Sequence, residues 1–89
     1  MYSNLATKKD KKVGVITHFF GKMKVGVVKL SGVLSVGDNI RIIGGETDFD
    51  QSVQSIEVDK KKIKKAKKGD LVGLKFSQKV RKGYKVYKI

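Results

Sequence analysis

The chain of 89 residues contains no cysteine, no proline and no tryptophan. Without cysteine it can form no disulfide, no thiolate nucleophile and no zinc ribbon, which fits an intracellular protein. Long hydrophobic runs are missing too: no apolar stretch approaches the roughly 18 residues of a membrane-spanning helix, and residues 1–12 lack the apolar core of a signal peptide. We therefore expect a soluble, cytoplasmic protein with no membrane partner.

Acidic residues are few. Eight Asp and Glu stand against 21 Lys and Arg, which gives a net charge of +13 and an isoelectric point near 10.1. Such an excess attracts polyanions and predicts contact with nucleic acid. Only Arg41 and Arg81 are arginines, and lysine contacts phosphate as a point charge, so any contact should be directed at the backbone. The alternative is that the lysines only solubilise the surface and guard strand edges.

Known catalytic and phosphate-binding motifs are also missing. The chain has no G-x-x-x-x-G-K-[ST] loop and no G-x-G-x-x-G followed by a helix, so it is not a self-sufficient GTPase and no nucleotide is expected. His18, the single histidine, has no nucleophile or orienting carboxylate near it in the sequence. Since so short a chain buries only a small core, an enclosed active site is not expected. We predict a protein that is not an enzyme and has no cofactor.

One acidic segment has the spacing of a calcium loop. Glu46, Asp48, Asp50 and Glu57 fall at positions 1, 3, 5 and 12 of that motif. However, Gln51 occupies the position where the sharp turn requires glycine, and no helices flank the segment. We expect a solvated acidic tip without a metal ion.

Ten glycines separate clusters of β-branched residues, a pattern typical of β proteins. Short strands at close spacing, with no convincing helix, predict an all-β fold, a small six-stranded antiparallel β-barrel. We place this single domain at residues 13–89, after a flexible basic segment at residues 1–12. The predicted strands are 12–20, 24–30, 39–44, 52–59, 71–76 and 84–89.

Alternation within the strands predicts which side chains share a face. The polar segment 45–51 is expected to be a connection with Phe49 exposed at its tip, and a bulge is expected near residues 54–55. Phe20 is the one other aromatic residue whose place suggests exposure, and the rest are mostly placed like core residues, which argues against a binder that relies on base stacking. The alternation groups Val13 with Val15, Thr17 and Phe19, Val25 with Val27, and Ile40 with Ile42.

The lysine run KKKIKKAKK, residues 60–68, is the best candidate for a contact surface. Ile63 and Ala66 are its only apolar residues and like charges repel at i, i+4, so we expect an extended connection with these two side chains turned inward. A polyanion would relieve the repulsion among the lysines, although such a run is also typical of a solvated loop. The candidate RNA-binding residues are Lys60, Lys61, Lys62, Lys64, Lys65, Lys67 and Lys68, with Arg81 and Lys82.

The order and spacing of four segments resemble domain 2 of the translational GTPases, the β-barrel that follows the G domain in elongation factor Tu. The segments are VGVITHFFGKMKVGVVKLSGVLSVGDNIRIIG (13–44), VQSI (53–56), AKKGDLVGL (66–74) and KGYKVYKI (82–89). The match covers Val13 to Ile89. Similar barrels occur as small elongation-factor-like proteins, which GGETDFDQSVQSIEVD (44–59) resembles most, and as C-terminal domains of U32 peptidase family proteins.

The resemblance implies roles for the recurring glycines. In such barrels Gly37-Asp38 and Gly69-Asp70 form tight turns into strands, where glycine supplies a positive φ and the aspartate accepts backbone N–H bonds. At the third turn Gly83 is followed by Tyr84 instead of aspartate. That turn should therefore be less fixed.

The resemblance also implies a function. In the large factors this barrel packs on the G domain, helps to hold the aminoacyl end of tRNA or touches ribosomal RNA, but no tRNA-contacting residue carries over. We expect a monomeric, non-catalytic, translation elongation factor-like module that binds the backbone of rRNA or tRNA through its lysine-rich face. The alternative is a protein-interaction or assembly module that docks on a separately encoded enzyme or translation factor.

Overall fold

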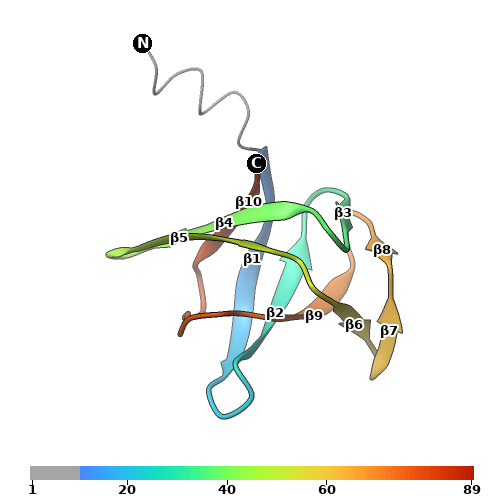
Figure 1. The fold of residues 1–89 in the computed structure, drawn as a ribbon, viewed down its shortest axis with the longest axis horizontal. Coiled ribbons are helices and arrows are strands. Elements are labelled where there is room, and N and C mark those ends of the chain that lie inside the picture. The colour runs from blue at the N-terminus through green and yellow to red at the C-terminus, as the bar shows by residue number, and fades with distance from the viewer. Residues whose placement is uncertain (1–10) are drawn as a thin grey trace.

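A computed structural model describes residues 11–89, and every regular element among them is a β-strand (Figure 1). The all-β prediction is confirmed. No helix among these residues is long and apolar enough to cross a membrane. Most of the predicted segment 1–12 lies outside the described residues. The strands are β1 (Lys11–Phe20), β2 (Val25–Leu30), β3 (Leu34–Ser35), β4 (Asn39–Gly44), β5 (Thr47–Ser52), β6 (Ile56–Val58), β7 (Lys61–Ile63), β8 (Lys65–Ala66), β9 (Leu71–Lys75) and β10 (Lys85–Lys88).

Eight strands form one antiparallel sheet in the order β5-β4-β10-β1-β2-β9-β6-β7, and β3 pairs with β8 separately. The sheet has free edges at β5 and β7, so the predicted closed, six-stranded barrel is wrong in closure and in strand number. A side chain replaces backbone pairing near one edge. The amide of Gln51 on β5 donates to the Lys75 carbonyl (2.8 Å) and accepts from the Ser77 N–H (2.8 Å).

The core is wholly apolar, with no buried polar or charged side chain among the described residues. Burying each large aliphatic or aromatic side chain contributes on the order of 2 kcal/mol, so this core supplies the main stabilising term. Its members are Val13, Ile16, Val28, Leu30, Leu34, Ile40, Ile42, Val53, Ile56, Ala66, Val72, Leu74, Phe76, Val80 and Val86.

The predicted alternation along β1 holds for Val13 and Phe19, which face the core, and fails between them at Val15 and Ile16. Val13 and Ile16 are buried, whereas Val15 is only half-buried. The pairing register of β1 shifts once against β10, between Lys12 and Gly14, and once against β2, between Ile16 and His18. Such bulges insert an extra residue and change which face the following side chains occupy.

The grouping of Val25 with Val27 on β2 is confirmed: both are half-buried, on the face opposite to the buried Val28 and Leu30. The inward face of β2 begins at Gly26. A Cβ there would lie 2.5 Å from Cε2 of Phe76, so the phenyl ring occupies the space that a side chain would need. The prediction for β4, with Ile40 and Ile42 buried together, is confirmed.

The segment 45–51 is not a simple connection, since most of it forms β5 against β4. Asp48 and Asp50 lie on the exposed face, where Nε of Arg41 is 3.5 and 3.0 Å from their carboxylate oxygens. Phe49 is half-buried and packs against the core, so its predicted exposure is wrong. A single apolar residue among polar ones made this strand resemble a loop.

The strand predicted at residues 52–59 is interrupted. Ser52 ends β5, residues 53–55 have no strand pairing, and Ile56 begins β6. The irregularity expected near residues 54–55 is therefore present, as a break between two strands.

The two Gly-Asp pairs form the expected turns. Gly37 and Gly69 have φ values of 97° and 94°, in the left-handed region that favours glycine. The Asp38 carboxylate accepts the Ser35 N–H at 2.8 Å, and the Asp70 carboxylate accepts the Lys67 N–H at 3.1 Å. Each aspartate thus satisfies a backbone donor at the start of its own turn.

The third turn keeps this backbone geometry without the aspartate. Gly83 has a φ of 95°, and the Tyr84 N–H donates to the Arg81 carbonyl at 3.2 Å. The Tyr84 ring packs over Gly44, where a Cβ would overlap the ring of the tyrosine. At this turn the packing of the Tyr84 ring on Gly44 thus takes the place of the aspartate carboxylate that is present in the other two turns.

Candidate nucleic-acid interface

The lysine run is extended, as predicted, and forms β7, β8 and the turns around them. Ala66 is buried and Ile63 is half-buried against the core, so both apolar side chains turn inward. The Val36 N–H donates to the Lys64 carbonyl at 2.9 Å, and Leu34 pairs with Ala66. The lysines of the run are all exposed: Lys60, Lys61, Lys62, Lys64, Lys65, Lys67 and Lys68.

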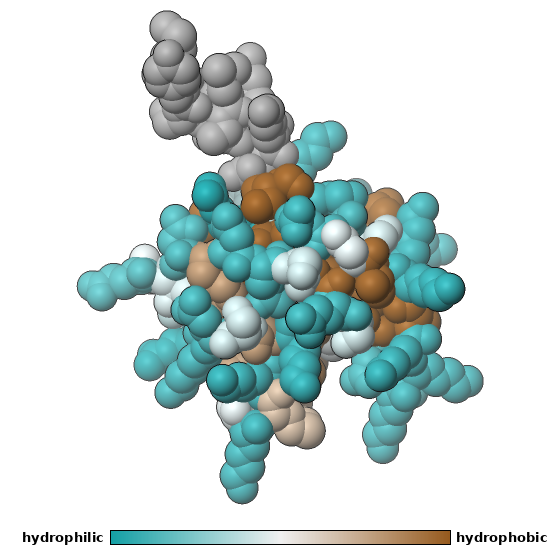
Figure 2. Space-filling view, in the orientation of Figure 1, coloured by the Kyte–Doolittle hydropathy of each residue, from teal (hydrophilic) through white to brown (hydrophobic). Residues whose placement is uncertain are grey.

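This packing holds the backbone of the run in place, while its lysine side chains are all exposed to solvent. Because backbone pairing and two inward side chains fix the segment, its basic side chains project from defined positions. Figure 2 shows long hydrophilic side chains projecting from the side of the molecule that carries β7 and β8 in Figure 1, beside an apolar area. The run is therefore an ordered basic surface.

Arg81 and Lys82 lie elsewhere. They precede β10 and line a separate hollow with Thr17, His18 and Phe19. In Figure 1 the connection from β9 to β10 lies on the opposite side of the molecule from β7 and β8. The structure thus divides the predicted RNA-binding residues into two groups.

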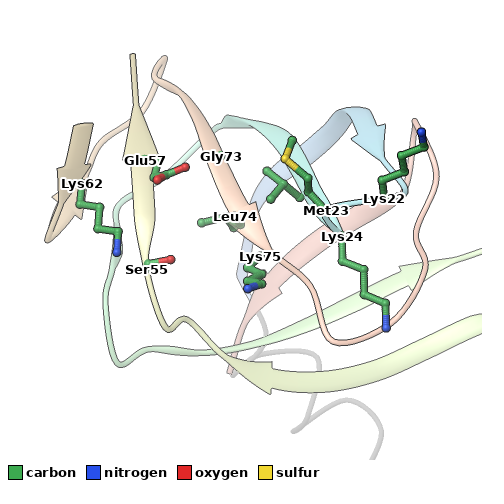
Figure 3. Close-up of a pocket in the computed structure, with 10 residues that line it drawn as sticks. Lys22, Met23, Lys24, Ser55, Glu57, Lys62, Gly73, Leu74 and Lys75 are labelled. Atoms are coloured by element: carbon green, nitrogen blue, oxygen red, sulfur yellow. The ribbon is translucent and has the colours of Figure 1, made fainter. Parts of the chain in front are cut away.

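A groove of about 600 Å³ extends the basic surface of β7 across the sheet (Figure 3). Figure 3 shows Lys62 at one wall of the groove and the β1–β2 turn at the other wall, with the end of β9 between them. Four lysines and one glutamate line it, a net charge of +3 (four minus one). The lining residues are Lys22, Met23, Lys24, Val25, Ser55, Glu57, Lys62, Gly73, Leu74 and Lys75.

Strand register brings these distant residues together. Val25 pairs with Lys75, and Glu57 pairs with Gly73 on one side and Lys62 on the other. The groove is hollow at Gly73 because the strand presents no side chain there. The atoms nearest to a Cβ at Gly73 would be Val25 Cγ1 (3.6 Å), the Glu57 carbonyl oxygen (3.7 Å) and Glu57 Cβ (3.8 Å), which are ordinary contacts.

The wall opposite Lys62 is built by the β1–β2 turn. The Met23 N–H donates to the Phe20 carbonyl at 3.2 Å, and Lys24 has a φ of 53°. The Lys24 carbonyl accepts the Phe76 N–H at 2.8 Å, which ties the turn to the end of β9. The turn is thereby held beside Lys75.

Of the four groove lysines, only Lys62 belongs to the residues predicted from the sequence. Lys22, Lys24 and Lys75 were missed because they lie in short segments of ordinary charge, far from the run. The spacing of Gly73 and Lys75 on β9 could have indicated an outward hollow beside a cation. Their proximity to Lys62 depends on the strand order β2-β9-β6-β7.

The groove can attract anions and offers an apolar floor. Within residues 11–89 no three His, Cys, Asp or Glu side chains gather in a way that could hold a metal ion. Asp48 and Asp50, from the calcium-like spacing, lie beside Arg41 instead.

Comparison with known proteins identifies the fold. No family model matches the chain. The chain is 36% identical over 77 residues to an uncharacterised protease of Methanocaldococcus jannaschii, and the match covers 85% of the chain but only 19% of that protein. The chain therefore spans about a fifth of the length of this curated relative.

Two crystal structures share the fold. Both are of the C-terminal domain of a Geobacillus thermoleovorans protein described as a U32 peptidase. One superposes with a TM-score of 0.84 at 16% identity, covering 89% of this chain and 92% of that domain. The selenomethionine variant gives a TM-score of 0.81 at 16% identity, covering 85% and 96%. The fold is thus that of a U32 peptidase C-terminal domain, and the comparisons do not show the link to elongation factor Tu domain 2.

Proposed function

We propose that this chain is a non-catalytic binding module, similar to the barrels of translation factors, whose lysine-rich face contacts the backbone of RNA such as rRNA or tRNA. The observation that carries the proposal is the exposed, ordered lysine run on β7 and β8, which continues through Lys62 into a groove of net charge +3. The protease name belongs to a relative of which this chain matches 19%, so it supports no catalytic role here.

Lysines arranged in this way are better suited to contact the phosphates of a nucleic acid than to recognise its bases. Lysine offers a compact charge on a flexible stem, without the planar fork with which arginine reads guanine. Each phosphate that is neutralised releases condensed counterions, so affinity comes largely from the number of contacts. The expected interaction is therefore strong at low salt and tolerant of sequence.

The affinity of the protein for total tRNA should fall steeply with salt. If about four lysines contact phosphates at once, the slope of log K against log salt should lie near −3, because each contact contributes roughly −0.7 to −0.9. Fluorescence anisotropy across a sodium chloride series measures this slope. No binding at low salt, or a slope near zero, would overturn the proposal.

A docking module for a larger protein is the second candidate. It is favoured by the match to only 19% of a longer protease and by the apolar area beside β3 and β8 in Figure 2. Val33 and Val36, which flank β3, are 44% and 41% exposed, and apolar patches with polar surroundings mark protein contacts. Association with a defined partner that survives nuclease and high salt would favour this function over RNA binding.

A further inference from the structure

Two aromatic rings lie exposed beside the groove. Phe20 is 47% exposed, and its ring centroid lies 6.3 Å from that of His18, with the ring planes tilted by 32°. Met23, in the following turn, is 61% exposed. Scattered exposed apolar residues are ordinary, but these three lie within six residues of one strand end and its turn.

The bulge in β1 explains why the rings face outward. The pairing register against β2 shifts between Ile16 and His18, and the Thr17 hydroxyl donates to the Val27 carbonyl at 3.2 Å. Beyond this shift Phe19 packs against the core, while its neighbours His18 and Phe20 are exposed. Side chains two apart on a strand share a face, so the two rings form one platform.

The platform connects the two basic groups of the molecule. Phe20 pairs with Val25, which lines the lysine groove. His18 lines the hollow that contains Arg81 and Lys82. The two rings thus lie between cations on both sides, and Met23 continues the apolar surface into the groove.

We propose that this face binds an unpaired RNA segment, with bases against His18, Phe20 and Met23 and phosphates along the groove lysines. The inference rests on the proposed RNA-binding function and names its substrate class. A single strand fits because its bases expose π-faces to aromatic rings, whereas a duplex keeps its bases stacked inside. The positive side chains beside the two rings complement the negative phosphates that connect the bases of the RNA. The groove lysines are Lys22, Lys24, Lys62 and Lys75.

The test compares two probes, a fluorescein-labelled oligouridylate of about ten nucleotides and a blunt RNA duplex of about ten base pairs. The double variant His18→Ala/Phe20→Ala should lower affinity for the single strand roughly tenfold, since stacking on an aromatic side chain is lost, and leave duplex affinity within about twofold. Gly73→Ala, whose Cβ meets only ordinary contacts and narrows the groove, should also weaken binding of the single strand selectively. Ile43→Ala on β4, which removes an exposed apolar side chain elsewhere, is the matched control and should change neither affinity.

The outcomes separate the two proposals. If the wild-type protein binds neither probe, the proposed function fails. If it binds both and the double variant weakens both equally or neither, RNA binding stands and the unpaired-strand inference is overturned. Displacement of the oligouridylate by polyglutamate at equal charge concentration would also overturn it, because charge alone would then explain the groove. If the double variant loses affinity for the single strand alone, and its circular dichroism spectrum is unchanged, the unpaired-strand inference is supported.

Discussion

Reversing three charges of the lysine run, Lys61→Glu, Lys64→Glu and Lys67→Glu, is expected to abolish RNA binding and leave the melting temperature almost unchanged. The three side chains are exposed, and the segment is held by the inward Ile63 and Ala66, which the variant retains. Each lost phosphate contact removes a counterion-release contribution, and each new carboxylate repels the backbone. We expect affinity to fall by on the order of 100-fold or more at low salt.

A second triple variant separates local contact from total charge. Lys12→Glu, Lys29→Glu and Lys85→Glu change the net charge by the same amount at exposed positions on β1, β2 and β10. This control should weaken binding far less. Equal losses in the two triple variants would mean that only the overall field matters. A large drop in the melting temperature of the first variant would mean that its lysine stems pack against the protein.

Gly26→Ala is expected to destabilise the fold by about 1–3 kcal/mol, the usual cost of overpacking a filled core. Its Cβ would lie 2.5 Å from Cε2 and 3.0 Å from Cδ2 of Phe76, a ring that is 2% exposed and has no room to move outward. Urea denaturation followed by circular dichroism measures the change in the free energy of unfolding.

Two comparisons make the Gly26 result specific. Gly73→Ala, on the neighbouring strand β9, meets only ordinary contacts and should be neutral or slightly stabilising, because alanine lowers the entropy of the unfolded chain. In a Phe76→Leu background the cost of Gly26→Ala should shrink, since the two positions are in contact. An unchanged cost in that background would contradict the assignment of the strain to the phenyl ring.

The features that the sequence predicted correctly are those fixed by local chemistry. Gly37-Asp38 and Gly69-Asp70 contain both the residue that permits a positive φ and the carboxylate that accepts the turn's N–H. Ile40 and Ile42 alternate within an undisturbed ladder. The lysine run stayed extended because its two apolar residues could not support a helix. In each case the deciding interaction lies within a few residues of the chain.

The features that could not be predicted depend on pairing between distant segments. The two register shifts along β1 bury Ile16 and leave Val15 half-buried, and no local sequence pattern predicts them. The face of β2 is set by Phe76, fifty residues away (76 minus 26), which needs the space at Gly26. Closure of the sheet into a barrel depends on whether its edge strands β5 and β7 pair, and these strands are distant from each other in the sheet order.

The candidate site follows the same division. The lysine run was recognisable because its charges are consecutive in the sequence. The groove was not, since its lysines come from three segments that only the strand order brings together. Alternation alone places His18 and Phe20 on one face, but their position beside the groove depends on the pairing of Phe20 with Val25 on β2.

The central claim is that RNA contacts the lysine run and the adjoining groove, and NMR titration tests it most directly. Adding RNA to the isotope-labelled protein should shift the backbone amide signals of residues 60–68, 22–25 and 73–75, while those of β4 and β5 stay in place. Mutating residues 61, 64 and 67 to glutamate should remove these shifts. Shifts confined to β3, β4 and β5, or no shifts at low salt, would contradict the account.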